Sequence, residues 1–90
     1  MKVRVKVFAS LRERLGWRER EHDVEARDIK GLLEAVGGEL YDTIMDKERG
    51  RLLPQYKVLL NGRDIDFLEG LKTELKPQDE ILIFPPVGGG

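Results

Sequence analysis

At 90 residues, the chain is long enough for one small domain with one core. Its 16 lysine and arginine residues are balanced by 17 aspartate and glutamate residues, and the formal net charge of −1 argues against a dedicated nucleic-acid-binding protein, which would carry a basic excess. With no cysteine and 1 histidine, the chain cannot form a disulfide scaffold, a thiol nucleophile or a cysteine-based zinc site, and a histidine metal site or catalytic triad is hard to build.

Neither a targeting segment nor a membrane segment is indicated. The N-terminal residues alternate charge with valine, where a signal peptide would have an unbroken apolar stretch. The longest purely apolar runs, such as residues 81–84, fall far short of the ~20 residues that a membrane helix needs. We therefore expect a cytoplasmic protein that binds no membrane.

The first part of the chain predicts two strands. Basic and apolar residues alternate from Lys2 to Val7, which is the period-two pattern of a strand with one buried and one solvated face. In this phase Phe8 lies on the solvated face. Residues 10–16 favour a short helical turn, and the polar residues 19–24 predict an edge strand.

Asp28 begins the most distinct predicted helix, because its short carboxylate can accept hydrogen bonds from the first free N–H groups. Four apolar residues follow at the spacing i, i+3, i+4 and i+7, which predicts an amphipathic helix that ends at Gly37. Gly31 inside this helix costs roughly 1 kcal/mol relative to alanine, and a close approach of the helix to a sheet would account for it. Residues 40–45 favour a second short helical segment, and residues 46–51 a charged loop.

The second half of the chain predicts three more strands. Apolar residues alternate over residues 56–60 and end at the hairpin signal Asn61-Gly62, so residues 63–66 form a short return strand. Residues 67–75 form an irregular connection with scattered apolar side chains. The last strand, residues 80–84, is apolar on both faces, which is typical of a strand in the middle of a sheet.

Two of the four prolines and three of the ten glycines lie in the last six residues, Pro85-Pro86-Val87-Gly88-Gly89-Gly90. Proline has no N–H group for a neighbouring strand, so the chain must leave the sheet there. Six extended residues reach at most about 20 Å, and glycine fits a narrow slot that a side chain would block. These features favour a functional tail that reaches into a narrow site, and the alternative is a frayed end without function. We predict a domain over residues 1–84 and a flexible tail over residues 85–90.

The ending Phe84-Pro85-Pro86-Val87 followed by glycines resembles the C-terminus of MoaD, the small subunit of molybdopterin synthase. The resemblance extends to archaeal ubiquitin-like modifier proteins and, more distantly, to the thiamine sulfur carrier ThiS, and it covers essentially the whole chain. Residues 5–13, 60–71 and 75–80 are similar to the opening, middle and late segments of this family. Gly88 is a departure, because the family usually has alanine, serine or threonine before the last two glycines.

The resemblance implies an α+β fold of the β-grasp (ubiquitin-like) type, a twisted mixed sheet with one main helix, residues 28–36, across one face. It also implies a sulfur carrier that is not itself an enzyme and holds no cofactor or metal. A ubiquitin-activating-type enzyme would use ATP to adenylate the carboxylate of Gly90, and sulfur would then replace AMP to give a thiocarboxylate. Gly88, Gly89 and Gly90 would enter the active site of the large subunit of molybdopterin synthase, which transfers the sulfur to a pterin precursor.

The strand phases predict an apolar patch on the sheet face away from the helix. If the valines of the first strand face the helix, Phe8 faces outward, and the same reasoning leaves Leu59, Leu82 and Phe84 on the outer face. A contiguous exposed apolar patch generally marks a partner site. The resemblance implies that residues matching Phe8, Leu68 and Phe84 pack against the partner enzyme. The alternative is that the irregular connection folds over part of this face.

The residues also fit other functions. A ubiquitin-like modifier joined through Gly90 to lysines of other proteins uses the same activation step, and so does a sulfur carrier for tRNA thiolation. A plain binding module with a disordered end would show no ATP-dependent adenylation. The remaining polar residues favour structural interpretations: His22 is expected to be a solvated or paired surface histidine, and Asp64, Asp66 and Glu69 a solvated loop rather than general acids or metal ligands.

Overall fold

The structure is a computed structural model, and it describes residues 1–86. Val87, Gly88, Gly89 and Gly90, which include most of the predicted tail, lie outside the described residues. The elements in chain order are β1 (Lys2–Val7), α1 (Ser10–Leu15), β2 (Glu19–Asp23), α2 (Ile29–Val36), α3 (Gly38–Ile44), β3 (Met45–Asp46), β4 (Arg51–Leu52), β5 (Lys57–Leu60), β6 (Arg63–Asp64), the 3-10 helices η1 (Ile65–Phe67) and η2 (Gly70–Lys72), and β7 (Glu80–Phe84).

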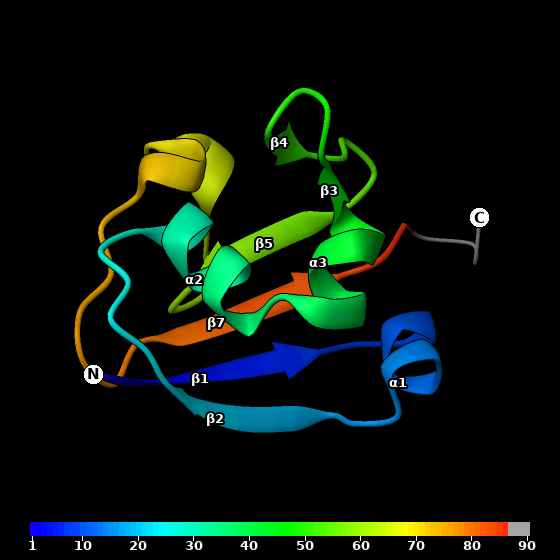
Figure 1. The fold of residues 1–90 in the computed structure, drawn as a ribbon, viewed down its shortest axis with the longest axis horizontal. Helices are drawn as coiled ribbons and strands as arrows, with labels where there is room; N and C mark the ends of the chain where they lie inside the picture. Colours follow the sequence, from blue (N-terminus) through cyan, green and yellow to red (C-terminus); the bar gives the residue numbers. More distant parts are fainter. Residues whose placement is uncertain (87–90) are drawn as a thin grey trace.

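Five of the strands form one mixed sheet in the order β2-β1-β7-β5-β6. The first strand, β1, runs parallel to the last strand, β7, while the β1–β2, β5–β7 and β5–β6 pairs are antiparallel. The helices α2 and α3 cover one face of this sheet (Figure 1). The apolar character of residues 80–84 on both faces predicts a strand in the middle of the sheet, and the central position of β7 confirms this prediction.

The core lies between the sheet and the helices, and it is built by the alternation of the strands. In β1 the valines are fully buried while the residues between them are not, and β7 repeats this pattern with Ile81 and Ile83. From the other side, α2 contributes Ile29, Leu32 and Leu33, all fully buried. Burial of such a side chain stabilises the fold by about 1.5–3 kcal/mol. The opposite face of the sheet, called the open face below, is therefore the one that the helices leave uncovered.

The N-terminal cap of α2 is as predicted, but the reason for Gly31 is different. The carboxylate Oδ1 of Asp28 accepts a hydrogen bond from the N–H of Gly31 at 2.8 Å. A Cβ atom on Gly31 would lie 3.2 Å from this oxygen and 3.3 Å from the Cβ of Ala26. The expected close approach to the sheet as the reason for Gly31 is wrong: the crowding comes from the cap residue Asp28 and from Ala26, which precedes it.

Two loop predictions are corrected in detail. The charged loop is held at both ends by pairing of β3 with β4, which form a separate two-stranded ribbon. The return strand ends at Asp64 rather than Asp66, because the Asp64 carboxylate accepts a hydrogen bond from the N–H of Asp66 at 2.9 Å and starts the 3-10 helix η1. This turn places Ile65 in the core. Over residues 1–86, no helix has the length and apolar character needed to cross a bilayer.

Candidate functional site

An aromatic pair stands on the open face where β1 and β7 end. The rings of Phe8 and Phe84 stack with their centroids 4.3 Å apart and their planes 9° from parallel. Each ring is half-buried, whereas the preceding residues Val7 and Ile83 point into the core. A stacked pair of this kind contributes ~0.5–1.5 kcal/mol beyond its buried area. The pair therefore forms an apolar surface at the end of β7, directly before Pro85 in the chain.

Two leucines extend this surface along the sheet. Leu82 of β7 lies directly opposite Leu59 of β5, and both are half-buried on the open face. The structure thus brings together four of the five residues that the sequence predicts for partner docking. We call these four the outer apolar patch: Phe8, Leu59, Leu82 and Phe84.

Leu68 is not part of the outer apolar patch. It packs against the core and lines a separate hollow together with Leu60, which points to the helical side of the sheet, and Asn61. The connection that carries it packs beside α2 (Figure 1). A docking role for Leu68 stays a prediction. In the same segment Phe67 is 88% exposed. Its exposure could not be predicted from the sequence, because a single turn of 3-10 helix is too short to show a hydrophobic periodicity.

Guanidinium groups border the outer apolar patch on the side of α1. The guanidinium of Arg12 lies 5.0 Å from the centroid of the Phe8 ring, and its Nε donates a hydrogen bond to the carbonyl oxygen of Val7 at 2.9 Å. Arg18 lines the same hollow as Phe8 and Arg12. Within residues 1–86, no carboxylate forms an ion pair with either arginine. A partner surface with carboxylates at this border would complement the patch.

On the opposite border, Lys57 of β5 lies across from Phe84. Its ammonium group forms an ion pair with Asp66 at 3.0 Å and a longer one with Asp64 at 3.9 Å. The hydrogen bond that Lys57 donates to Asp66, followed by the charges of Asp66 and Asp64, raises the pKa of Lys57 above its usual range. These carboxylates therefore neutralise a cation at the edge of the patch, which agrees with the solvated loop expected from the sequence.

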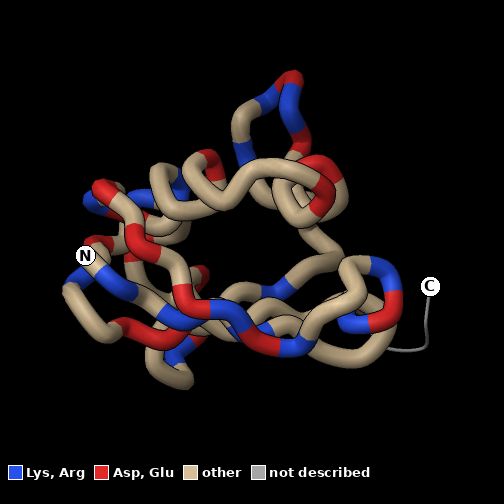
Figure 2. The backbone as a smooth tube through the Cα atoms, turned by 60° about the horizontal axis from the view of Figure 1, so that its bottom comes forward, with Lys and Arg blue, Asp and Glu red and all other residues tan. Residues whose placement is uncertain are grey.

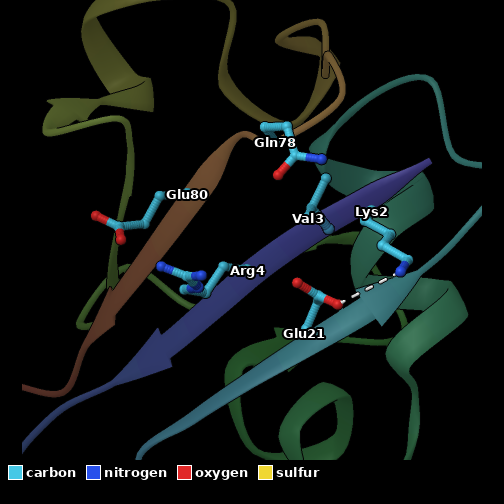
Figure 3. A pocket seen from close by; sticks show the side chains of 6 residues that line it. All are labelled: Lys2, Val3, Arg4, Glu21, Gln78 and Glu80. Atoms are coloured by element: carbon cyan, nitrogen blue, oxygen red, sulfur yellow. Dashed lines mark ion pairs between the residues drawn. The ribbon is translucent and has the colours of Figure 1, made fainter.

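The other half of the open face is charged. Arg4 pairs with Glu19 at 3.3 Å and Lys6 pairs with Glu80 at 3.0 Å, and Figure 3 shows Glu21 of β2 beside Lys2 of β1. Figure 2 shows that basic positions lie among acidic ones along the backbone. Exposed ion pairs contribute only ~0–1 kcal/mol each. The open face is thus solvated where β7 begins and apolar where β7 ends.

His22 differs from its prediction as a solvated or paired histidine. It lies opposite the buried Val3 in the β1–β2 register, is half-buried, and meets the ring of Trp17 edge-on at 6.4 Å. Its Nε2 atom is buried and has no hydrogen-bond partner among the described residues. Burial and, to a smaller extent, the positive charge of Arg20 lower the pKa of His22 from its usual value of 6.5.

This environment predicts that His22 makes the fold sensitive to mild acid. The lowered folded-state pKa means that the unfolded chain takes up the proton first as the pH falls, so the free energy of unfolding decreases below pH 6.5. We expect denaturant melts of the native chain to lose stability between pH 7 and 5 more steeply than those of His22→Gln, which has no imidazole to titrate. Parallel pH profiles for the two chains would contradict the proposed burial of a neutral imidazole.

A mixed sheet with its first and last strands paired in the centre and a helix across one face defines a β-grasp, ubiquitin-like protein. The chain belongs to the ThiS family, whose family model matches residues 5–90. It is 35% identical over 97 residues to small archaeal modifier protein 3 of Haloferax volcanii, and 31% identical over 93 residues to an Archaeoglobus fulgidus protein named "Putative sulfur carrier protein"; both alignments cover 100% of each chain.

The similarity extends to solved structures. The solution structure of small archaeal modifier protein 1 from Methanosarcina acetivorans is 37% identical to this chain with a TM-score of 0.79, and the match covers 99% of this chain and 96% of the other. The expected fold and family are confirmed. Members of this family are small ubiquitin-like carrier and modifier proteins, not catalysts.

Proposed function

We propose that this protein is a MoaD-like sulfur carrier, whose Gly90 is adenylated and then thiocarboxylated and which donates the sulfur for molybdopterin (molybdenum cofactor) biosynthesis. The supporting observation is the position of the outer apolar patch. Its stacked pair ends at Phe84, directly before Pro85-Pro86, so a partner seated on the patch lies where the chain leaves the sheet. Docking on the patch would guide Gly88, Gly89 and Gly90 into the active site of that partner.

The chemistry needs only the carboxylate of the last glycine from this chain. A carboxylate oxygen of Gly90 attacks the α-phosphorus of ATP, the bond to the β-phosphate breaks, and pyrophosphate leaves. Hydrosulfide, or an equivalent donor at the oxidation level of sulfide, then attacks the carbonyl carbon, and the bond to AMP breaks to give the thiocarboxylate. Because glycine has no side chain, the carbonyl carbon stays open to attack.

Two partners would use the outer apolar patch in turn. A ubiquitin-activating-type enzyme binds ATP and performs the adenylation, and the large subunit of molybdopterin synthase uses the thiocarboxylate. The carrier itself contributes no acid, base, metal or cofactor in this scheme. Both partners should present an apolar surface to Phe8 and Phe84 and carboxylates to Arg12 and Arg18, since these guanidinium groups have no acidic neighbour in ion-pair distance within residues 1–86.

A ubiquitin-like modifier is the second candidate function. The full-length similarity to a protein named as a small archaeal modifier, at 35% identity, favours it. In this case activated Gly90 would be joined through an amide bond to lysine side chains of target proteins. A carrier that supplies sulfur for tRNA thiolation would pass through the same adenylate and thiocarboxylate.

Intact mass spectrometry of the protein expressed in its own host separates these functions. We expect a fraction of the chains to carry one sulfur in place of one oxygen at the C-terminus, and this fraction to disappear when the adenylating enzyme is deleted. Purified thiocarboxylate should then convert the pterin precursor to molybdopterin with the large subunit. Glycine remnants of this chain on lysines, without such conversion, would support the modifier. Chains that are neither thiolated nor conjugated would refute both functions.

A further inference from the structure

The strand β2 forms an outer edge of the sheet. Its one strand neighbour is β1, and Figure 1 shows no other described segment beyond it on the far side. The opposite edge, β6, is only 2 residues long and continues directly into η1, whereas β2 has 5 residues. An open edge of this length presents backbone groups to which another strand can be added.

Hydrogen bonds at the two ends of the β1–β2 pair fix which backbone groups of β2 stay free. The N–H of Val24 donates to the carbonyl oxygen of Met1 at 2.8 Å. At the other end, the N–H of Val7 donates to the carbonyl oxygen of Arg18 at 3.0 Å. Bonded and non-bonded residues alternate in an antiparallel pair, so the even-numbered residues of this segment bond to β1. The N–H and C=O groups that point to the open edge belong to the odd-numbered residues, Glu19, Glu21 and Asp23.

The two faces of β2 differ in charge. The odd-numbered side chains lie on the open face, and the exposed fraction of the side chain is 46% for Glu19, 55% for Glu21 and 74% for Asp23. Arg20 and His22 lie on the other face, which the helices partly cover. The basic groups of the β1 segment already pair with these carboxylates from one side, so an added strand would meet them from the other side as partly neutralised, still exposed acidic groups.

On the helical side, a hollow of about 230 Å³ runs along this edge. Trp17, Val36 and Leu40 line it together with the polar side chains of Arg20, His22 and Glu39, and the guanidinium of Arg20 lies 4.8 Å from the centroid of the Trp17 ring. The unpartnered Nε2 of His22 belongs to the same lining. Small apolar side chains of an added strand would enter this hollow.

A second copy of this chain does not fit the edge. Pairing two β2 strands with their open faces on the same side places acid opposite acid in every register, because each residue on that face is Glu or Asp. Like charges directly opposite each other destabilise a strand pair. The complementary strand instead carries basic residues at alternate positions with small apolar residues between them. The strand β1, with the sequence KVRVKV, has this pattern and already pairs with β2 from the other side.

We propose that β2 accepts an extended segment of a partner protein as a sixth strand of the sheet, with lysine or arginine opposite Glu19, Glu21 and Asp23 and apolar side chains in the hollow beside Trp17. The segment pairs through the free backbone groups of these three residues. At one end this interface adjoins the outer apolar patch, because Glu19 lines the same hollow as Phe8.

The probe is a capped peptide Lys-Val-Arg-Val-Lys-Val, titrated into the ¹⁵N-labelled chain and followed by NMR. We expect shift changes centred on β2, and slower hydrogen exchange at the amides of Glu19, Glu21 and Asp23, which exchange fast in the free protein. A capped Glu-Val-Glu-Val-Glu-Val peptide should not bind. Shift changes centred on Phe8 and Phe84 instead would overturn the proposal.

Two variants test the pairing itself. Glu21→Pro removes an N–H that points to the open edge and none that bonds to β1, so the domain should stay folded and lose at least tenfold in peptide affinity. Glu21→Lys keeps the backbone donor but places a like charge opposite the basic peptide, so it should weaken that peptide, and the acidic peptide should still not bind because Glu19 and Asp23 remain. Unchanged binding to folded Glu21→Pro would overturn the proposal, whatever the result of the sulfur-transfer experiments.

Discussion

Deleting Gly90, or adding residues after it, is expected to abolish adenylation of this protein. In the proposed mechanism the carboxylate of Gly90 is the nucleophile that attacks ATP, and an extension converts that carboxylate into an amide while a deletion withdraws it by one residue. The melting temperature should stay almost unchanged, since Gly90 follows the end of β7 at Phe84 and surface changes usually alter stability by no more than about ±0.5 kcal/mol. The measurement is ATP–pyrophosphate exchange with the purified adenylating enzyme.

Gly88→Ala is the matched control for this experiment. It changes the same segment, keeps the terminal carboxylate in place, and introduces a residue that the family usually carries there. We expect adenylation of this variant to remain close to that of the native chain. An extended chain that is adenylated without first being trimmed would show that the proposed mechanism is wrong.

Phe84→Asp is expected to abolish partner binding while the domain stays folded. Phe84 is half-buried on the open face, so a carboxylate there stays hydrated in the free protein, and the main loss is the ~0.5–1.5 kcal/mol of its stack with Phe8. At an interface the same carboxylate is desolvated against the apolar surface of the partner, which costs several kcal/mol. The Kd for the large subunit or the adenylating enzyme should rise by more than about a hundredfold, as measured by calorimetry.

Val5→Asp is the control with the opposite outcome. Val5 is 0% exposed beneath the helices, and an unpaired charge at such a position costs a large share of the ~5–15 kcal/mol that holds a small domain together. This variant should unfold or melt far below the native chain. If Phe84→Asp unfolded as well, Phe84 would be a core residue and the outer apolar patch would not be a docking surface.

The outward direction of the four residues in the outer apolar patch could be predicted, because it depends on strand phase alone. Once the valines of β1 are assigned to the core, alternation places Phe8 outside, and the same reasoning applies to Leu59, Leu82 and Phe84. That these residues meet in one patch required the sheet order, which came from the central character of β7 and from the family resemblance. Leu68 lies on an irregular connection without a period, so its side could not be predicted from spacing.

The two errors have different causes, a strand-pairing contact for His22 and a contact within the same short segment for Gly31. His22 lies between two acidic residues, which predicts a surface residue. Its register opposite Val3 instead turns it inward beside Trp17. A glycine within the helix at position 31 predicts a close contact between helix and sheet. The atoms that a Cβ at this position would crowd instead belong to Asp28 and Ala26, which precede it in the chain. In both cases the deciding neighbour is set by the pairing or capping geometry, which composition and periodicity do not encode.

The central position of β7 also has a consequence for synthesis. Among the elements that the structure describes, this strand is the last to leave the ribosome, and it joins β1 to β5. A nascent chain that lacks residues 80–84 therefore leaves β1 and β2 disconnected from the β5–β6 hairpin and the core between them open. Pairing of the two ends of a chain is slow to form because the whole loop between them must close first. The glycines proposed for activation thus leave the ribosome only after the strand that completes the sheet.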